Sequence, residues 1–445
     1  MNATDRTSTL IRGGRIIDPA SGLDATGDVL ISDGRIKAIE VGQPLSVEPD
    51  TRVHDASGCL VVPGLIDIHV HLRDPGQQHK ETIRTGSMAA VAGGFTTICC
   101  MPNTAPALDA PEHVEYVHAR AREAGLARVH CIGAATLGRK GLTLSPIESL
   151  ARNGCVGFSD DGDCIENPDM MKSVLQACAA TNSVFMQHCQ EKSLTIGSVM
   201  HEGAVSLKLG LRGWPRQAEE MIIDRDVRIN RDIGCSYHAQ HLSSAGSIKI
   251  IRDARSRGEP VTGEVTPHHL LLTDEACLDY DTDAKMNPPL RTEADRLKLI
   301  ESVADGTITI LATDHAPHTM AEKQQPFDDA PFGIIGVETA LPLYARALVE
   351  SSAIDWPRLI ACMTINPARL LRLDENGLGR LEPGGPADVT IIDPDHQWII
   401  APEMFHCRSR NCPFNGWTVN ARAIATFVGG RPCHVLEDSR FQSPA

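Results

Sequence analysis

Short apolar runs alternate with stretches of helical periodicity through the middle of the chain. Residues 111–124 and 169–181 are two of the predicted helices. Eight strand–helix repeats in about 260 residues are typical of a (β/α)8 TIM-type barrel. A doubly wound open sheet is the alternative. In such sheets a glycine-rich phosphate-binding motif often follows the first strand, and this chain has none after its first predicted strand. The predicted strands are residues 60–72, 95–102, 128–136, 154–160, 183–189, 234–242, 260–267 and 307–314.

Both ends of the chain have the pattern of short β-strands instead. Within residues 29–39, the dipeptide Asp33-Gly34 is typical of a tight hairpin turn. Similar strand patterns occur at 10–18, 387–393 and 423–431, so we expect both ends to meet in one small domain. The predicted fold is α/β and has two parts. Residues 1–58 and 380–445 form a β-sandwich-like composite domain, and residues 59–379 form the catalytic (β/α)8 barrel.

Composition and charge narrow the classes of protein. Of the 445 residues, 42% are hydrophobic and 22% are charged, which is ordinary for a soluble enzyme. The formal net charge of −15 argues against a nucleic-acid partner, because such partners select basic surfaces. No apolar run has membrane-spanning length and residues 1–9 lack the apolar core of a signal peptide, so we expect a cytoplasmic protein. The 14 cysteines are scattered without a C-x-x-C pair, and we expect reduced core residues.

The first predicted strand ends in an unusual run of polar residues. Alternation places Asp67, His69 and His71 on one face, and Arg73 follows on the same side. A single buried histidine is more often a hydrogen-bonded core residue than a ligand. Two imidazoles leaving one face of a strand favour a shared metal ion. An arginine beside them can hold a carboxylate through two hydrogen bonds.

Polar residues also follow the other predicted strands, at the end where barrel enzymes place their active sites. Four histidines and two aspartates from five strands would converge, which is enough for two metal ions with a bridging carboxylate. Two such ions can hold a hydroxide that is nucleophilic at neutral pH. Spacing leaves Asp160 and Asp161 as alternatives, and Asp314 is the candidate proton shuttle. The proposed convergent set is His69, His71, His188, His241, Asp314 and one of the two adjacent aspartates.

The motifs together resemble the dihydroorotase family, class I type, of the amidohydrolase superfamily. They follow the family order through the whole barrel, and the β-rich ends resemble the family's composite β-domain. The H-x-H motif alone would indicate only the superfamily. The matching segments are 63–76, 92–97, 101–104, 159–162, 286–291, 312–318 and 366–369.

The resemblance implies a reaction and a site. Members of the family reversibly hydrolyse (S)-dihydroorotate to N-carbamoyl-L-aspartate in de novo pyrimidine (UMP) biosynthesis, by attack of a metal-bridging hydroxide with Asp314 as proton shuttle. Two zinc ions per subunit are implied, with Asp161, the second aspartate of the D-D-G run, as the bridge. The other implied zinc ligands are His69, His71 and Asp314 for one ion, and His188 and His241 for the second. The implied substrate-binding residues are His71, Arg73, Asn103, Asn287, His318, Phe332 and Gly333.

One departure from the family pattern surrounds His188. Many relatives have an acidic residue where Gln187 and Gln190 stand in this chain. Such neighbours of a metal ligand tune metal affinity or pH optimum rather than the class of reaction.

Two alternative functions are tested by particular residues. Hydantoinases and allantoinases typically bridge their metals with a carboxylated lysine at the end of the fourth strand, and residues 154–161 contain no lysine. Inactive dihydroorotase-like partners of aspartate transcarbamoylase lose metal ligands, whereas this chain keeps all six. A homodimer is the family expectation, and aspartate transcarbamoylase is a further partner that the resemblance allows.

Overall fold

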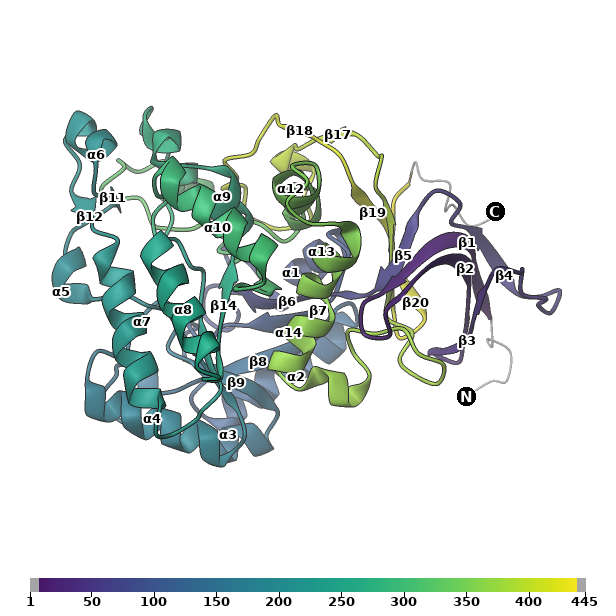
Figure 1. The fold of residues 1–445 in the computed structure, drawn as a ribbon, viewed down its shortest axis with the longest axis horizontal. Coiled ribbons are helices and arrows are strands. Elements are labelled where there is room, and N and C mark those ends of the chain that lie inside the picture. The colour runs from purple at the N-terminus through teal and green to yellow at the C-terminus, as the bar shows by residue number, and fades with distance from the viewer. Residues whose placement is uncertain (1–7, 438–445) are drawn as a thin grey trace.

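A computed structural model describes residues 8–437 and contains all eight predicted barrel strands (Figure 1). They form one parallel sheet in which the spatial order follows the chain order, so the predicted barrel is confirmed. Residues 1–7 and 438–445, which belong to the predicted polar N-terminus and β-rich domain, lie outside the described residues. The strands are β6 (Leu65–Val70), β7 (Phe95–Cys100), β8 (Arg128–Ala134), β9 (Cys155–Ser159), β10 (Val184–Gln187), β13 (Tyr237–Ala239), β14 (Val261–Val265) and β15 (Ile310–Leu311).

The first and last barrel strands meet through individual hydrogen bonds rather than a regular ladder. The backbone N–H of His71 donates to the carbonyl of His315 at 2.8 Å. The hydroxyl of Thr313 donates to the buried carboxylate of Asp67 at 2.6 Å. These contacts nearly close the barrel and bring the polar ends of β6 and β15 side by side.

Helices connect the strands and pack on the outside of the barrel (Figure 1). Two of them match the predicted ranges within a residue, and the second begins at an Asn167 whose side chain accepts from the N–H groups of Asp169 and Met170. The helices are α1 (Ile83–Ala92), α2 (Pro111–Ala124), α3 (Ile147–Arg152), α4 (Pro168–Ala180), α5 (Lys192–Thr195), α6 (Ala204–Leu209), α7 (Gln217–Asn230), α8 (Ala245–Ser256), α9 (Pro267–Leu271), α10 (Glu293–Asp305), α11 (Met320–Lys323), α12 (Ala340–Tyr344), α13 (Trp356–Met363) and α14 (Ile365–Leu370).

Strands from both ends of the chain pair in a second eight-stranded sheet (Figure 1). The predicted hairpin turn is present: Asp33 and Gly34 have φ of 51° and 76°, and the pairing of Ser32 with Arg35 makes it a two-residue turn. Its strands are β1 (Thr9–Asp18), β2 (Leu23–Ser32), β3 (Arg35–Val41), β4 (Arg52–Asp55), β5 (Leu60–Pro63), β16 (Val389–Asp393), β19 (Arg422–Val428) and β20 (Arg431–Val435).

The strand predicted over 60–72 is divided at Gly64. Its first half, β5, pairs with β1 and β16 in the sheet of the chain ends, and its second half, β6, begins the barrel. A Cβ at Gly64 would lie 2.1 Å from Oγ1 of Thr96, so only glycine lets the chain pass here. The chain therefore passes directly from one sheet to the other at Gly64. The domain boundaries as a whole, 1–58 and 380–445 against 59–379, stay a prediction.

Part of the C-terminal region leaves its sheet and lies against the barrel. Between β16 and β19 the chain forms only the short pair β17 (Trp398–Ile399) and β18 (Thr418–Val419). Within this excursion Cys407, Ser409 and Asn411 are buried. The strand patterns of the sequence do not predict this contact. Two further short strands, β11 (Met200–His201) and β12 (Gly213–Trp214), pair after β10.

Two expectations from composition, on the cysteines and on membrane-spanning segments, can be compared with the described residues. Thirteen of the 14 cysteines are buried, and the last, Cys433, is half-buried. Over residues 8–437, none of the helices combines the length and the apolar character needed to cross a membrane.

Candidate active site

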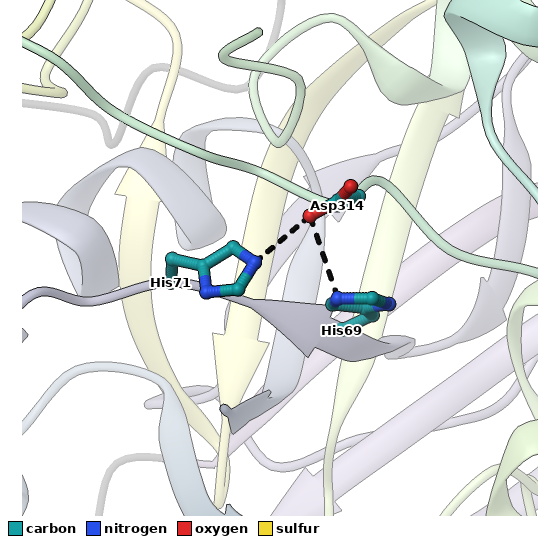
Figure 2. Close-up of side chains that lie close together, drawn as sticks. All are labelled: His69, His71 and Asp314. Atoms are coloured by element: carbon teal, nitrogen blue, oxygen red, sulfur yellow. Dashed lines mark hydrogen bonds and ion pairs between the residues drawn. The ribbon is translucent and has the colours of Figure 1, made fainter. Parts of the chain in front are cut away.

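The ends of β6 and β15 bring three predicted ligands together (Figure 2). His69 is the penultimate residue of β6, His71 follows the strand, and Asp314 follows β15. Oδ1 of Asp314 lies 2.9 Å from Nε2 of His71 and 3.4 Å from Nε2 of His69. All three side chains are buried, so the carboxylate and the two imidazoles face one another away from bulk water.

Asp161 lies at the centre of the four histidines. Its Oδ1 is 3.4 Å from Nε2 of His69, 3.5 Å from Nδ1 of His188 and 3.6 Å from Nε2 of His241. Its Oδ2 is 3.4 Å from Nε2 of His71. Burial alone raises the pKa of Asp161, but the imidazoles outweigh it, and the net pKa is well below the usual range. This position suits a carboxylate that bridges two ions.

The neighbouring aspartate points elsewhere. Asp160 accepts hydrogen bonds from the backbone N–H of Thr136, at 3.0 Å, and from its hydroxyl. These two bonds tie the end of β9 to the segment after β8. Adjacent residues at a strand end face opposite sides, and the geometry places Asp161 rather than Asp160 among the histidines.

Two buried polar atoms at this centre make no hydrogen bond among the described residues. Nε2 of His69 and Oδ1 of Asp161 face each other at 3.4 Å without forming one. By contrast, Nδ1 of His188 and Nε2 of His241 share a hydrogen bond at 2.8 Å. Buried polar groups are rarely left unpaired in this way. Imidazole nitrogens and carboxylate oxygens converging on one point are the ligands that zinc-like ions select, so the residues fit a metal centre.

A second layer of residues holds the imidazoles. Oε1 of Glu264, on β14, lies 2.5 Å from Nδ1 of His69, and its Oε2 lies 3.1 Å from Nε2 of His238. Burial raises the pKa of Glu264, but His69 and His238, whose rings both hydrogen-bond to the carboxylate, lower it more, so the carboxyl is ionised. Sequence reasoning missed Glu264; the available signal was a charged residue inside an apolar strand. The same carboxylate thus links His69 to His238 on β13.

Two amide side chains hold the rings of His71 and His188. Asn103 accepts from Nδ1 of His71 at 2.8 Å, and Gln190 lies 3.1 Å from Nε2 of His188. The predicted substrate residue Asn103 thus also orients a ring. Gln187 faces away from His188 and donates to Asp226.

A cavity of about 320 Å³ opens over the histidines. The buried guanidinium of Arg73 lies at its wall, where Nε donates to the carbonyl of Pro317 at 3.2 Å and Nη2 lies 3.3 Å from Nε2 of His318. Burial lowers the pKa of Arg73 to about 10, so the group stays cationic at neutral pH. Every predicted site residue except His69 lines this cavity: His71, Arg73, Asn103, Asp161, His188, His241, Asn287, Asp314, His318, Phe332 and Gly333.

The far wall of the cavity comes from a close approach of two loops. A Cβ at Gly333 would lie 2.6 Å from the carbonyl oxygen of Ala316 and 2.7 Å from Cδ2 of His318, so this position requires glycine. Asn287 donates to Gln190 at 3.3 Å, and its buried Oδ1 has no partner among the described residues. That oxygen is available to a bound molecule.

Three site residues have left-handed backbone conformations. The φ angles of Arg73, His241 and Asp314 are 58°, 33° and 48°. Such angles are unfavourable for residues other than glycine and gather at functional sites, where the surrounding structure holds them. Strand-end side chains are thereby turned inward to the cavity.

Known proteins resemble this chain over nearly its whole length. A family model described as Dihydro-orotase-like matches residues 58–247. A protein named dihydroorotase from Syntrophotalea carbinolica is 46% identical over 429 residues, which cover 96% of this chain and 99% of the relative. Another protein of that name, from Pelotomaculum thermopropionicum, is also 46% identical, over 95% of this chain and 97% of the relative. Among solved structures, the L-hydantoinase (dihydropyrimidinase) of Arthrobacter aurescens has a TM-score of 0.85 and 24% identity, over 97% of this chain and 98% of that chain. At that identity the likeness concerns the fold alone.

Proposed function

The chain belongs to the dihydroorotase family, and on this premise we propose how its residues hydrolyse (S)-dihydroorotate reversibly to N-carbamoyl-L-aspartate in pyrimidine biosynthesis. It is a metal-dependent enzyme that acts on a small cyclic amide. The observation that carries the proposal is the position of the buried, cationic Arg73 in the cavity that also contains Asp161 and its surrounding imidazoles. A cation beside a hydrolytic centre selects a ring that carries a carboxylate.

We propose that two zinc ions occupy the centre. His69, His71 and Asp314 would hold one, and the two remaining histidines of the set, at 188 and 241, would hold the other, with Asp161 between them. When bound, such ions polarise a carbonyl and activate water for attack at neutral pH. The unpaired Nε2 of His69 and Oδ1 of Asp161 support this assignment.

The substrate is proposed to bind through its carboxylate and its ring. Arg73, Asn103 and His318 would take the carboxylate, because they present donors at one wall of the cavity. Asn287 would contact the polar ring through its free amide oxygen, and the Phe332–Gly333 segment would cover the ring. This arrangement holds the cleaved bond against the metal-ligating residues and excludes bulk water from it.

Asp314 is the proposed proton shuttle. Burial raises its pKa, but His69 and His71 lower it more, so the net pKa lies below the ordinary value and the group is an ionised carboxylate at neutral pH. It would take the proton of the attacking water and deliver it to the ring nitrogen that leaves. The same carboxylate serves both directions of the reversible reaction.

The alternatives are not favoured. The L-hydantoinase shares the fold, but residues 154–161 of this chain offer no lysine for a carboxylated bridge, and Asp161 occupies the centre instead. An inactive partner of aspartate transcarbamoylase would lack ligands that this chain keeps. We further propose a cytoplasmic homodimer, with aspartate transcarbamoylase as a further partner. Light scattering after gel filtration, alone and with the transcarbamoylase, tests both associations.

Metal analysis combined with substrate assays tests the function. Purified protein should contain zinc, approaching two ions per subunit, and should turn over dihydroorotate far faster than hydantoin or allantoin. Zinc-loaded protein that neither makes nor consumes dihydroorotate would refute the proposal. A clear preference for hydantoin or allantoin would assign the chain to the alternative reaction.

A further inference from the structure

The ring of His318 lies between two cationic side chains. Nζ of Lys80 is 3.3 Å from its Nδ1, and Nη2 of Arg73 is 3.3 Å from its Nε2. Burial, with the charges of Arg73 and Lys80, lowers the pKa of His318 to about 2, so the imidazole is neutral. A neutral imidazole has one N–H and one acceptor nitrogen. It therefore accepts a hydrogen bond from only one of the two cations.

Lys80 is the better placed donor. Its ammonium group is held 2.8 Å from Oε1 of Glu322, and its side chain is only 12% exposed. Oε2 of Glu322 lies 3.9 Å from Nδ1 and is too distant to accept a hydrogen bond from it. Arg73, in contrast, already donates to Pro317 and faces the cavity. Nδ1 is thus the acceptor, and the ring proton resides on Nε2.

We propose that Lys80 is a positioning residue that sets the tautomer of His318 so that its Nε2–H donates to the carboxylate of the substrate. In this tautomer the Nε2–H of His318 and the Nη2 of Arg73 are two donors that face each other at 3.3 Å, and the backbone of Phe332 is a further hydrogen-bond partner of the ring. An incoming carboxylate supplies an acceptor that both donors can share. The unbound site is therefore prepared for an anion, which lowers the cost of reorganisation on binding. This inference rests on the proposed function.

One segment of the C-terminal excursion holds both partners of this contact. The hydroxyl of Ser409 donates to the backbone carbonyl of Lys80 at 2.9 Å. Two residues later, Oδ1 of Asn411 accepts from the backbone N–H of His318 at 3.2 Å. The amide of Asn411 also donates to the carbonyls of Ala316 and Gly333, each at 3.0 Å. The positions of donor and ring are fixed by the same short stretch of chain.

Steady-state kinetics of zinc-loaded variants test the inference. Lys80→Met removes the donor and keeps the length of the side chain, whereas Lys80→Arg keeps a cationic donor. We expect Lys80→Met to raise KM for dihydroorotate on the order of tenfold, with kcat within about twofold of wild type. Inhibition by orotate, which carries the same carboxylate, should weaken in parallel. Lys80→Arg should recover most of the affinity.

Lys192→Met is the matched control, since Lys192 pairs with the carboxylates of Asp163 and Glu166 instead of an imidazole. A KM for Lys80→Met within about twofold of wild type would overturn the inference. A fall in kcat at unchanged KM would also overturn the inference. That result would show that Lys80 supports the position of Asp314, and hence turnover, rather than the binding of the substrate carboxylate. If Lys80→Met fails to fold, a KM for Lys80→Arg that equals wild type supports the inference, and a loss of turnover without a rise in KM overturns it. A wild-type enzyme inactive on dihydroorotate would instead refute the proposed function.

Discussion

Oε1 of Glu264 lies 2.5 Å from Nδ1 of His69, and the opposite nitrogen of the same ring faces Asp161 and Asp314 at 3.4 Å each. The glutamate thereby fixes which nitrogen carries the proton and leaves Nε2 free for a metal ion. Carboxylate–histidine pairs of this kind orient the ligand and raise its basicity. The proposed metal centre therefore depends on a residue that is not one of its proposed ligands.

Glu264→Gln should weaken zinc binding by about 10- to 100-fold, because the amide holds the ring less firmly and carries no charge. Competition with a chromogenic chelator measures the affinity. Glu301→Gln, on the exposed face of α10, is the control. Unchanged zinc affinity in Glu264→Gln would show that the contact with His69 has no role in metal binding.

Asp314→Asn should lower kcat by about 10²- to 10⁴-fold, because an amide cannot accept the proton of the attacking water. Zinc content is measured on the same preparation, since Asp314 is also a proposed ligand. Near-normal turnover would remove its assignment as the proton shuttle.

Arg73→Lys should raise KM for dihydroorotate by about tenfold or more and affect kcat less, because an ammonium group cannot form the paired hydrogen bonds of a guanidinium. Steady-state kinetics check this, with the exposed Arg84→Lys as the control. An unchanged KM would move the carboxylate site to another part of the cavity.

Glu338 predicts a pH dependence of stability. Burial raises its pKa to about 7, although the N–H groups of His406 and Cys407 partly oppose the shift. The folded protein therefore holds a proton that the unfolded chain has already released above its ordinary pKa of 4.5. The stabilisation is complete below that ordinary value and is lost as the pH rises through about 7.

Glu338→Gln keeps an acceptor for both N–H groups and does not ionise. The free energy of unfolding of the variant minus that of the wild type should therefore rise by about 2 to 3 kcal/mol from pH 5 to pH 8. Urea unfolding of both zinc-loaded proteins at the two pH values measures this. A constant difference between them would contradict a raised pKa.

The barrel and its metal-ligating candidates could be predicted because they depend on local patterns. Short apolar runs mark the barrel strands, and the polar residues at the end of a strand point to the barrel mouth, as His69 and His241 do. Spacing alone leaves both Asp160 and Asp161 open; the family resemblance implies Asp161, and in the structure Asp161 is the one that lies among the histidines. Their functional roles remain proposals.

The missed features all depend on contacts between distant parts of the chain. Nothing near Glu264 in the sequence indicates that it meets His69, and nothing near Lys80 indicates His318. The division of the first predicted strand at Gly64 also escaped, because an apolar run looks the same whether it serves one sheet or two. Periodicity in the sequence indicates whether a segment forms a helix or a strand. Its tertiary contacts depend on residues that are far away in the sequence.

The hydrogen bonds that Asn411 forms to the loops of the cavity have a consequence during synthesis of the chain. A chain leaves the ribosome from its N-terminus, and Asn411 follows Leu311, the end of the last barrel strand, by 100 residues. The residues around His318 and Gly333 are synthesised well before the amide that joins them. A nascent or prematurely terminated chain can thus carry every histidine of the proposed metal centre and still lack an ordered wall for the proposed substrate site.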